Sequence, residues 1–102
     1  MARELEYLDE AVLDAEGAAR WYAERSPTAA IRFSAELDRA EAAILDRPEA
    51  WPAVGDGNRH YLLRRFPFSV VYRIEENRVL IVAVAHARRR PGYWKHRGRR
   101  PA

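Results

Sequence analysis

The stretch "FSVVYRIEENRVLIVAVAH", residues 68–86, constrains the fold more than any other part of this chain. Residues 68–75 are rich in β-branched and aromatic side chains, and residues 78–86 are almost entirely apolar, which is typical of buried strands. Glu76 and Asn77 between them fit a two-residue hairpin loop, because asparagine tolerates positive φ. The sequence therefore predicts an antiparallel hairpin whose second strand is covered on both faces.

A two-residue loop also predicts which side chains share a face of the hairpin. It pairs Arg73 with Leu80 and Ser69 with Val84, and side chains paired across a ladder lie on one face. One face is then expected to carry Ser69, Val71, Arg73, Val82, Val84 and His86. The other face is expected to pack on helices through Phe68, Val70, Tyr72 and Ile74.

A third strand is predicted over residues 59–66, "RHYLLRRF", which ends at Pro67. If the bend around Pro67 is tight, Leu62 and Arg64 join the face of Arg73. A bulge at Pro67 would place Arg65 there instead of Arg64. Both arrangements fit the sequence.

The first half of the chain predicts one strand and two helices. "ELEYL", residues 4–8, alternates as a strand does, and from Asp9 small and aromatic residues recur at helical spacing as far as Arg25. Asp9 is a candidate cap for this helix, and Ser26-Pro27 is a start signal for the next, which ends before Pro48. Residues 47–58 are expected to form a loop in which Trp51 plugs the end of the core.

The predicted fold class is therefore α+β, with the order β-α-α-β-β-β and a helical hairpin packed on one face of a small antiparallel sheet. We expect a single domain over residues 1–97 and a frayed basic tail over residues 98–102. The sequence contains no cysteine and no run of apolar residues long enough for a membrane span. With no signal peptide in the acidic N-terminal stretch, a cytoplasmic location is expected.

Charge is divided unevenly between the two halves of the chain. Residues 1–50 hold 6 Lys+Arg and 12 Asp+Glu, whereas residues 51–102 hold 12 Lys+Arg and 3 Asp+Glu. Almost all of the positive charge is arginine, whose planar fork of donors suits phosphates and carboxylates. The second half therefore predicts a polyanionic partner, either a nucleic acid or an acidic protein, although a solvated basic surface also fits the composition.

The candidate site residues gather around the end of the last predicted strand. His86 is the one side chain there that can exchange protons near neutral pH. Arg88, Arg89 and Arg90 can hold phosphates, and Tyr93 and Trp94 can stack on bases. The same two aromatic residues can instead dock the tail on the core, and His86 can simply bind a backbone group.

The hairpin and the ending "AHARRRPGYW" resemble the RelE/ParE superfamily of toxins from bacterial type II toxin–antitoxin modules, in particular its plasmid stabilisation branch. The resemblance covers residues 4–95. It implies the β-α-α-β-β-β fold, an antitoxin partner whose C-terminal segment wraps the toxin, and no metal or organic cofactor. RelE-like members cut mRNA on the ribosome, which is the function we expect first, whereas ParE-like members inhibit DNA gyrase without catalysis. A non-toxic basic binding module is the third possibility.

For an mRNA endoribonuclease, the resemblance implies attack of a ribose 2′-OH on the adjacent phosphate. His86 and Tyr93 would then transfer protons, while Arg64, Arg73 and Arg89 would stabilise the developing charge. The residues that would contact the RNA are Arg65, Arg88, Arg90, Trp94 and Lys95. Ser69, however, stands where the RelE-like pattern has an arginine.

Overall fold

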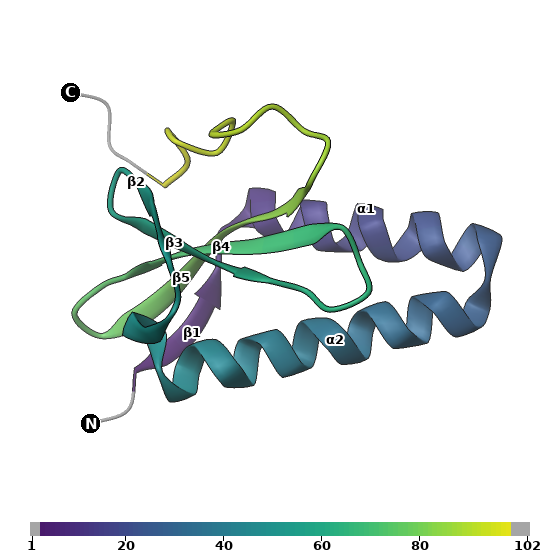
Figure 1. Ribbon diagram of the computed structural model, residues 1–102, viewed down its shortest axis with the longest axis horizontal. Coiled ribbons are helices and arrows are strands. Elements are labelled where there is room, and N and C mark those ends of the chain that lie inside the picture. The colour runs from purple at the N-terminus through teal and green to yellow at the C-terminus, as the bar shows by residue number, and fades with distance from the viewer. Residues whose placement is uncertain (1–2, 99–102) are drawn as a thin grey trace.

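The computed structural model describes residues 3–98 as two helices packed on one face of a five-stranded sheet (Figure 1). The expected frayed tail, residues 98–102, therefore lies outside the described residues except for Gly98. The elements in chain order are β1 (Glu4–Tyr7), α1 (Asp9–Arg25), α2 (Pro27–Asp46), a short 3-10 helix (Pro48–Ala50), β2 (Ala53–Gly55), β3 (Asn58–Leu62), β4 (Phe68–Ile74) and β5 (Arg78–His86). The sheet order is β1-β5-β4-β3-β2. The predicted α+β architecture is thus confirmed.

The sheet is mixed, and the prediction of an antiparallel sheet was wrong for one strand. β1 pairs with β5 in parallel, with Glu4 opposite Arg78 and Tyr7 opposite Ile81. The other neighbours are antiparallel because short loops join them. β1 has no such loop to a sheet neighbour, since both helices intervene before the next strand.

The helical hairpin forms as the sequence predicts. Ala11 and Ala18 of α1 and Phe33, Ala40 and Ile44 of α2 are buried against the sheet. Ser26 caps α2 by accepting a hydrogen bond from the Ala29 amide at 3.2 Å. Asp9, by contrast, is the first residue of α1 and not its cap, because Leu8 occupies the cap position without a side-chain hydrogen bond.

The segment 47–58 contains a strand that the sequence interpretation missed. Gly55 pairs with Asn58, so Asp56 and Gly57 form a two-residue turn between β2 and β3. Both have positive φ, 55° and 77°, as a type I′ hairpin turn requires. The Asp-Gly dipeptide was the signal for this hairpin. Trp51 packs against the core as expected, and its indole N–H donates to the Ala43 carbonyl at 3.3 Å.

β3 ends at Leu62, four residues earlier than expected. Arg65 has a φ of 66°, which takes the backbone out of the extended conformation. Leu62 pairs with Ser69 and therefore shares its face, but the bend is longer than the tight one considered above: Arg64 and Arg65 lie in the turn between β3 and β4 and extend neither strand. The sequence analysis expected either Arg64 or Arg65 on the sheet face of Arg73, and neither residue lies there.

A bulge in β5 changes the face on which His86 lies. Arg73 pairs with Leu80 as predicted, but Tyr72 pairs with Ile81 and Val71 with Ala83, so Val82 is an extra residue in β5. The side-chain period of a strand is 2, and one extra residue moves every later side chain to the opposite face. Val84 accordingly packs in the core beneath the helices, and His86 pairs with Phe68. The expectation that Val84 and His86 share the face of Arg73 was wrong for this reason.

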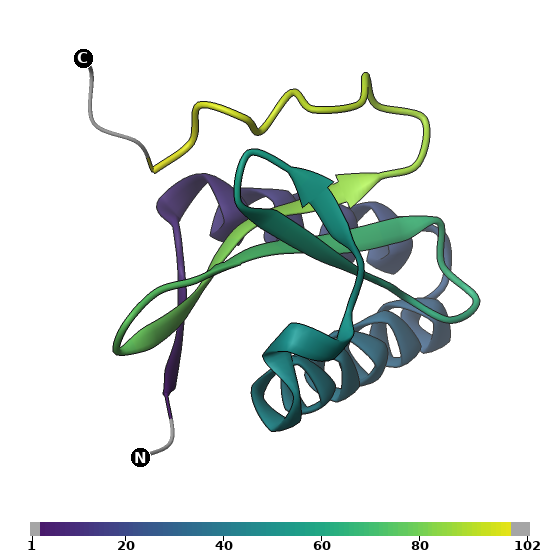
Figure 2. The ribbon, with the colours of Figure 1, turned by 60° about the vertical axis from the view of Figure 1, so that its left-hand side comes forward.

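The second face of the sheet is covered by the chain after β5, residues 87–98, which we call the tail. Tyr93 and Trp94 of the tail pack on a second apolar cluster formed by Val71, Leu80, Val82, Ala83 and Ala85. Figure 2 shows the tail and α2 on opposite sides of the sheet. β5 is therefore covered on both faces, as its apolar sequence predicts. None of the helices within residues 3–98 has the length and apolar character to cross a membrane.

Candidate functional site

The tail holds its shape through a series of backbone hydrogen bonds. The Ala87 amide donates to the Pro67 carbonyl at 2.7 Å, which fixes the exit of the tail from β5. Gly92 has a φ of 79°, a conformation that suits glycine, and here the chain turns back over the sheet. The Arg97 amide then donates to the Trp94 carbonyl at 2.9 Å. These turns place Tyr93 and Trp94 on the sheet face, as the docking alternative expected.

A cavity of about 630 Å³ lies between α1, the ends of β4 and β5, and the tail, and we call it the α1–tail cavity. Three candidate residues line it: His86, Arg89 and Tyr93. α1 contributes Leu13, Asp14, Gly17, Ala18, Trp21 and Tyr22. Pro67, Phe68 and Val84 complete the lining. The cavity thus combines apolar walls with one histidine, one arginine, one tyrosine and one aspartate.

His86 is engaged locally at the end of β5. Its Nδ1 accepts a hydrogen bond from the Arg88 amide at 3.0 Å. The ring also meets Phe68 edge to face, with ring centroids 5.0 Å apart. These contacts orient the imidazole and occupy Nδ1, which leaves Nε2 as the nitrogen that a ligand in the cavity could meet.

Tyr93 lies between two arginines. The guanidinium carbons of Arg89 and Arg97 are 4.1 and 5.1 Å from the centre of its ring. Burial raises the pKa of the Tyr93 phenol, as does Asp14, and the two arginines partly offset this. At neutral pH the phenol is therefore protonated, so it can donate a proton or a hydrogen bond but is a poor base.

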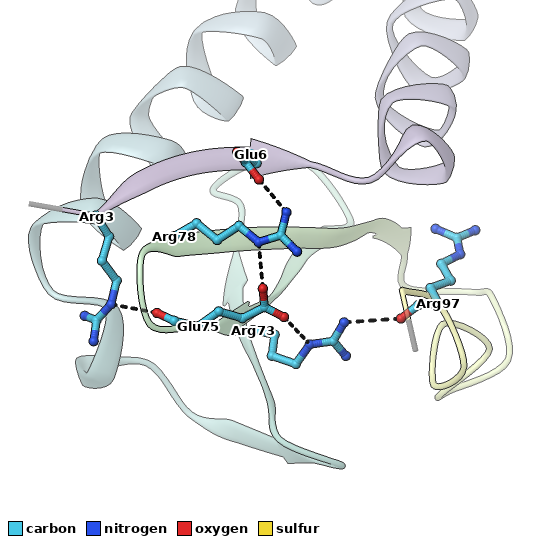
Figure 3. Close-up of polar contacts among 6 residues, drawn as sticks. All are labelled: Arg3, Glu6, Arg73, Glu75, Arg78 and Arg97. Carbon is cyan, nitrogen blue, oxygen red and sulfur yellow. Dashed lines mark hydrogen bonds and ion pairs between the residues drawn. The ribbon is translucent and has the colours of Figure 1, made fainter. Parts of the chain in front are cut away.

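Arg73 is held beneath the tail and is not an open sheet residue (Figure 3). Its side chain is 12% exposed, its Nε lies 3.6 Å from a carboxylate oxygen of Glu75, and its Nη2 donates to the Arg97 carbonyl at 3.3 Å. Glu75 also binds Arg78, at 2.6 Å. Two of the three Arg73 nitrogens are therefore already engaged within the chain.

Arg97 is the residue at this site that sequence reasoning missed. Its Nη1 lies 2.7 Å from Asp14 of α1 and donates to the Val82 carbonyl of β5 at 3.1 Å. The same Asp14 oxygen accepts from the Val84 amide at 3.0 Å. Asp14 and Arg97 are 14% and 17% exposed. β1 pairs with β5 only as far as Ile81. Beyond that point, Arg97 and Asp14 bind the backbone of β5 at Val82 and Val84. Their separation of 83 residues leaves no signal in a single sequence.

The remaining candidates are distributed over the surface. Arg88, Arg90 and Lys95 are exposed on the tail, while Trp94 is half-buried in the second apolar cluster. Arg64 lines a smaller cavity of about 330 Å³ beside Trp51, His60 and Leu62, and Arg65 is exposed in the adjoining turn. The structure therefore brings His86, Arg89 and Tyr93 together but places Arg64 and Arg73 elsewhere. Within residues 3–98, no three His, Asp or Glu side chains are grouped so that they could hold a metal ion.

The comparisons with known proteins agree with this architecture. Residues 5–91 match the family model described as the ParE toxin of the type II toxin–antitoxin system, parDE. Nine chains among solved structures are similar, and one belongs to a structure titled "Chromosomal ParDE TA system from P. aeruginosa". That match has a TM-score of 0.73 and 18% sequence identity, and it covers 83% of this chain and 96% of the other, which establishes the shared fold. No curated protein matches the sequence. Since the family match spans most of the chain, the protein belongs to the ParE toxin family of type II toxin–antitoxin systems.

Proposed function

We propose that this protein is a toxin that arrests growth by binding DNA gyrase, and that a cognate antitoxin neutralises it. Membership of the ParE family supports gyrase as the target in preference to mRNA on the ribosome. On this proposal the toxin acts by occupying a surface of the enzyme and performs no chemistry of its own. Gyrase works in the cytoplasm, so we place the protein there too.

The observation that carries the proposal is the position of Arg73. A phosphate-cleaving site needs cations aimed at the place where charge develops. The Arg73 guanidinium instead contacts Glu75 and the Arg97 carbonyl beneath the tail. His86 lies beyond the Val82 bulge and therefore faces away from Arg73. The arrangement supports a binding role for this surface better than a catalytic one.

Cleavage of mRNA remains a second candidate because of one observation. His86, Arg89 and Tyr93 line the same cavity, and together they offer an imidazole, a cation and a protonated phenol. On this second candidate, a scissile phosphate bound in the α1–tail cavity would meet all three. The candidate is weaker because Ser69 supplies no charge where the RelE-like pattern has an arginine.

Two assays on purified protein separate these candidates. We expect the wild-type toxin to inhibit ATP-dependent supercoiling of a relaxed plasmid by gyrase, and His86→Ala to inhibit it equally well. In parallel, primer extension on ribosome-bound mRNA should reveal no new 5′ ends. Cleaved mRNA that disappears with His86→Ala, together with fully active gyrase, would instead identify a ribosome-dependent nuclease. Inactivity in both assays would favour a binding module without toxicity.

A further inference from the structure

The arginines at one end of the sheet have no acidic partner. Elsewhere the chain neutralises its own charge, since Arg73, Arg78 and Arg97 each form an ion pair with a carboxylate. Within residues 3–98, no such pair involves the exposed arginines of the turn between β3 and β4 or of the start of the tail, which are Arg64, Arg65, Arg88, Arg89 and Arg90. No Asp or Glu occurs in residues 57–74 or 77–102. The chain therefore does not compensate the positive charge at this end.

The pairing of β4 with β5 places these arginines on one surface. Phe68 at the beginning of β4 pairs with His86 at the end of β5, and the Ala87 amide donates to the Pro67 carbonyl at 2.7 Å. Figure 1 shows the turn between β3 and β4 and the start of the tail at the same end of the sheet. We call this surface the basic end, and it is formed by residues 64–65 and 88–90.

Arg65 has a backbone conformation that its contacts within the chain do not explain. Its φ of 66° lies in the left-handed region, which is uncommon for an arginine and suits glycine better. Within residues 3–98, the exposed Arg65 side chain forms no hydrogen bond or ion pair. Unfavourable conformations of this kind persist mainly at binding sites and switch regions. The position therefore suits a side chain that is kept for binding.

The surroundings of the basic end favour phosphates over an acidic protein. Arginine binds both phosphates and carboxylates through its fork of donors. Protein interfaces, however, are centred on large apolar or aromatic side chains. None of the exposed large apolar residues within residues 3–98 lies in segments 63–67 or 87–90. Interfaces with a nucleic acid are more polar and more positively charged, and the basic end matches that description.

The packing of the nearby aromatic residues favours a duplex over a single strand. Proteins bind single strands by stacking the bases on aromatic side chains. Here Phe66 packs on the core beneath the helices, and Tyr93 and Trp94 pack on the second apolar cluster. A duplex needs no such rings, because its phosphates lie on the outside at about one charge per 1.7 Å of helix axis.

We propose that the basic end binds the phosphate backbone of duplex DNA, with no preference for sequence, and so holds the toxin on the DNA on which gyrase acts. Each arginine that displaces a condensed cation from the backbone adds to the affinity by releasing that cation. The DNA contact is a property of this chain alone, whereas its part in growth arrest rests on the proposed function.

The wild-type toxin tests the DNA contact directly, with short fluorescent duplexes of unrelated sequence. We expect similar affinities for each duplex and a linear fall of log K with the logarithm of the salt concentration, by about 0.9 per phosphate contacted. The NMR amide signals of residues 64–66 and 87–90 should shift when a duplex is added. An affinity that does not depend on salt, or shifts confined to other segments, would overturn the proposal.

A double variant removes two charges from the basic end. Arg65→Gly combined with Arg88→Ala should weaken DNA binding at low salt at least about tenfold and reduce the salt slope by about 2. Arg39→Ala combined with Arg47→Ala is the matched control, because these side chains are 62% and 80% exposed on and beside α2. Equal DNA affinities of the two double variants would overturn the proposal.

The single variant Arg65→Gly separates binding from folding. Glycine adopts a positive φ without a steric cost, so the unfolding free energy should not fall below that of the wild type. Weaker DNA binding at undiminished stability would then follow from the lost charge. A less stable Arg65→Gly would mean that the arginine is kept for the fold, and the argument from its backbone would be wrong.

Competition with other polyanions tests the class of partner. Unlabelled duplex DNA should displace the fluorescent duplex, whereas polyglutamate at the same concentration of charge should displace it poorly. Equal displacement by polyglutamate would assign the basic end to an acidic protein. Tighter binding of single-stranded RNA than of duplex DNA would assign it to RNA. Either of these results overturns the proposal.

Supercoiling assays examine the target separately. If the basic end holds the toxin on the DNA, the Arg65→Gly, Arg88→Ala variant should need a higher concentration than the control variant to inhibit gyrase. A toxin that binds duplex DNA through the basic end but leaves gyrase active would retain the DNA site and overturn the proposed function. A toxin that inhibits gyrase but binds no DNA would do the reverse.

Discussion

Tyr72 is the largest side chain that is fully enclosed in the core, and its phenol shows how one polar atom is accommodated there. The hydroxyl donates a hydrogen bond to the Pro48 carbonyl, at the beginning of the 3-10 helix. Burial raises the pKa of Tyr72 to about 12, although Arg59 acts in the opposite direction. The folded protein therefore holds this proton more tightly than the unfolded chain, in which a tyrosine titrates near pH 10.

This difference predicts a loss of stability in alkaline solution. Below about pH 10 the phenol is neutral in both states, and its full contribution to stability is present. As the pH rises from 10 to 12, the unfolded chain loses the proton first, and about 2 kcal/mol of unfolding free energy is lost. Urea denaturation at pH 8, 10 and 11.5 measures this decline. Tyr72→Phe should be less stable at pH 8 but should decline less steeply, and an undiminished decline in this variant would assign the effect to other groups.

At the scale of the elements, features that depend on residues close in the chain could be predicted from the sequence. Features that depend on how one strand pairs with another could not. The period of α1 and α2, the Ser26 cap and the Glu76-Asn77 loop all depend on residues close in the chain, and each was predicted correctly. The bulge at Val82 depends on how β5 meets β4, and the strand pattern "VLIVAVA" is apolar on both faces, so it gives no sign of a change in parity. Without the bulge, His86 was predicted on the same face as Arg73, so the predicted site grouped two residues that lie on opposite faces of the sheet.

The cap of α2 carries a prediction at this scale. Ser26→Ala removes the oxygen that accepts from the Ala29 amide, and we expect the unfolding free energy to fall by about 1 kcal/mol. Ser34→Ala, at an exposed position within α2, is the matched control and should be neutral or slightly stabilising, because alanine is the better helix former. Chemical denaturation of the two variants compares them. Equal stabilities would mean that another group supplies the cap.

At the scale of the whole molecule, the tail is part of the folded core and not an appendage for binding alone. One apolar cluster includes residues of both helices, the cluster on the opposite face of the sheet includes Tyr93 and Trp94 of the tail, and β5 contributes to both. Arg97 connects α1, β4 and β5 through Asp14, Arg73 and the Val82 carbonyl. The basic ending that first indicated a nucleic acid or an acidic protein therefore has a structural role as well. The family match ends at residue 91, before Tyr93, Trp94 and Arg97.

Removing the Arg97 side chain should loosen this connection. Arg97→Ala removes the ion pair with Asp14 and the hydrogen bond to the Val82 carbonyl, and we expect the unfolding free energy to fall by about 2–3 kcal/mol. Arg90→Ala, at an exposed position of the same tail, should change stability by less than about 0.5 kcal/mol. Urea denaturation measures both, and Asp14→Asn combined with Arg97→Ala should cost less than the two single changes together. Similar stabilities of Arg97→Ala and Arg90→Ala would show that the contacts of Arg97 with Asp14 and the Val82 carbonyl do not stabilise the tail.

The position of β5 has a consequence for the order in which the molecule can form during synthesis. β5 lies between β1 and β4 in the sheet, yet among the strands within residues 3–98 it is synthesised last. Until residues 78–86 emerge, β1 has no neighbour in the sheet, and the apolar faces of both helices lack the β5 part of their cover. Folding therefore waits for long-range pairing between the two ends of the chain. The tail also needs β5, because Tyr93 and Trp94 pack on a cluster that β5 helps to form, so the surface made by the tail is completed last.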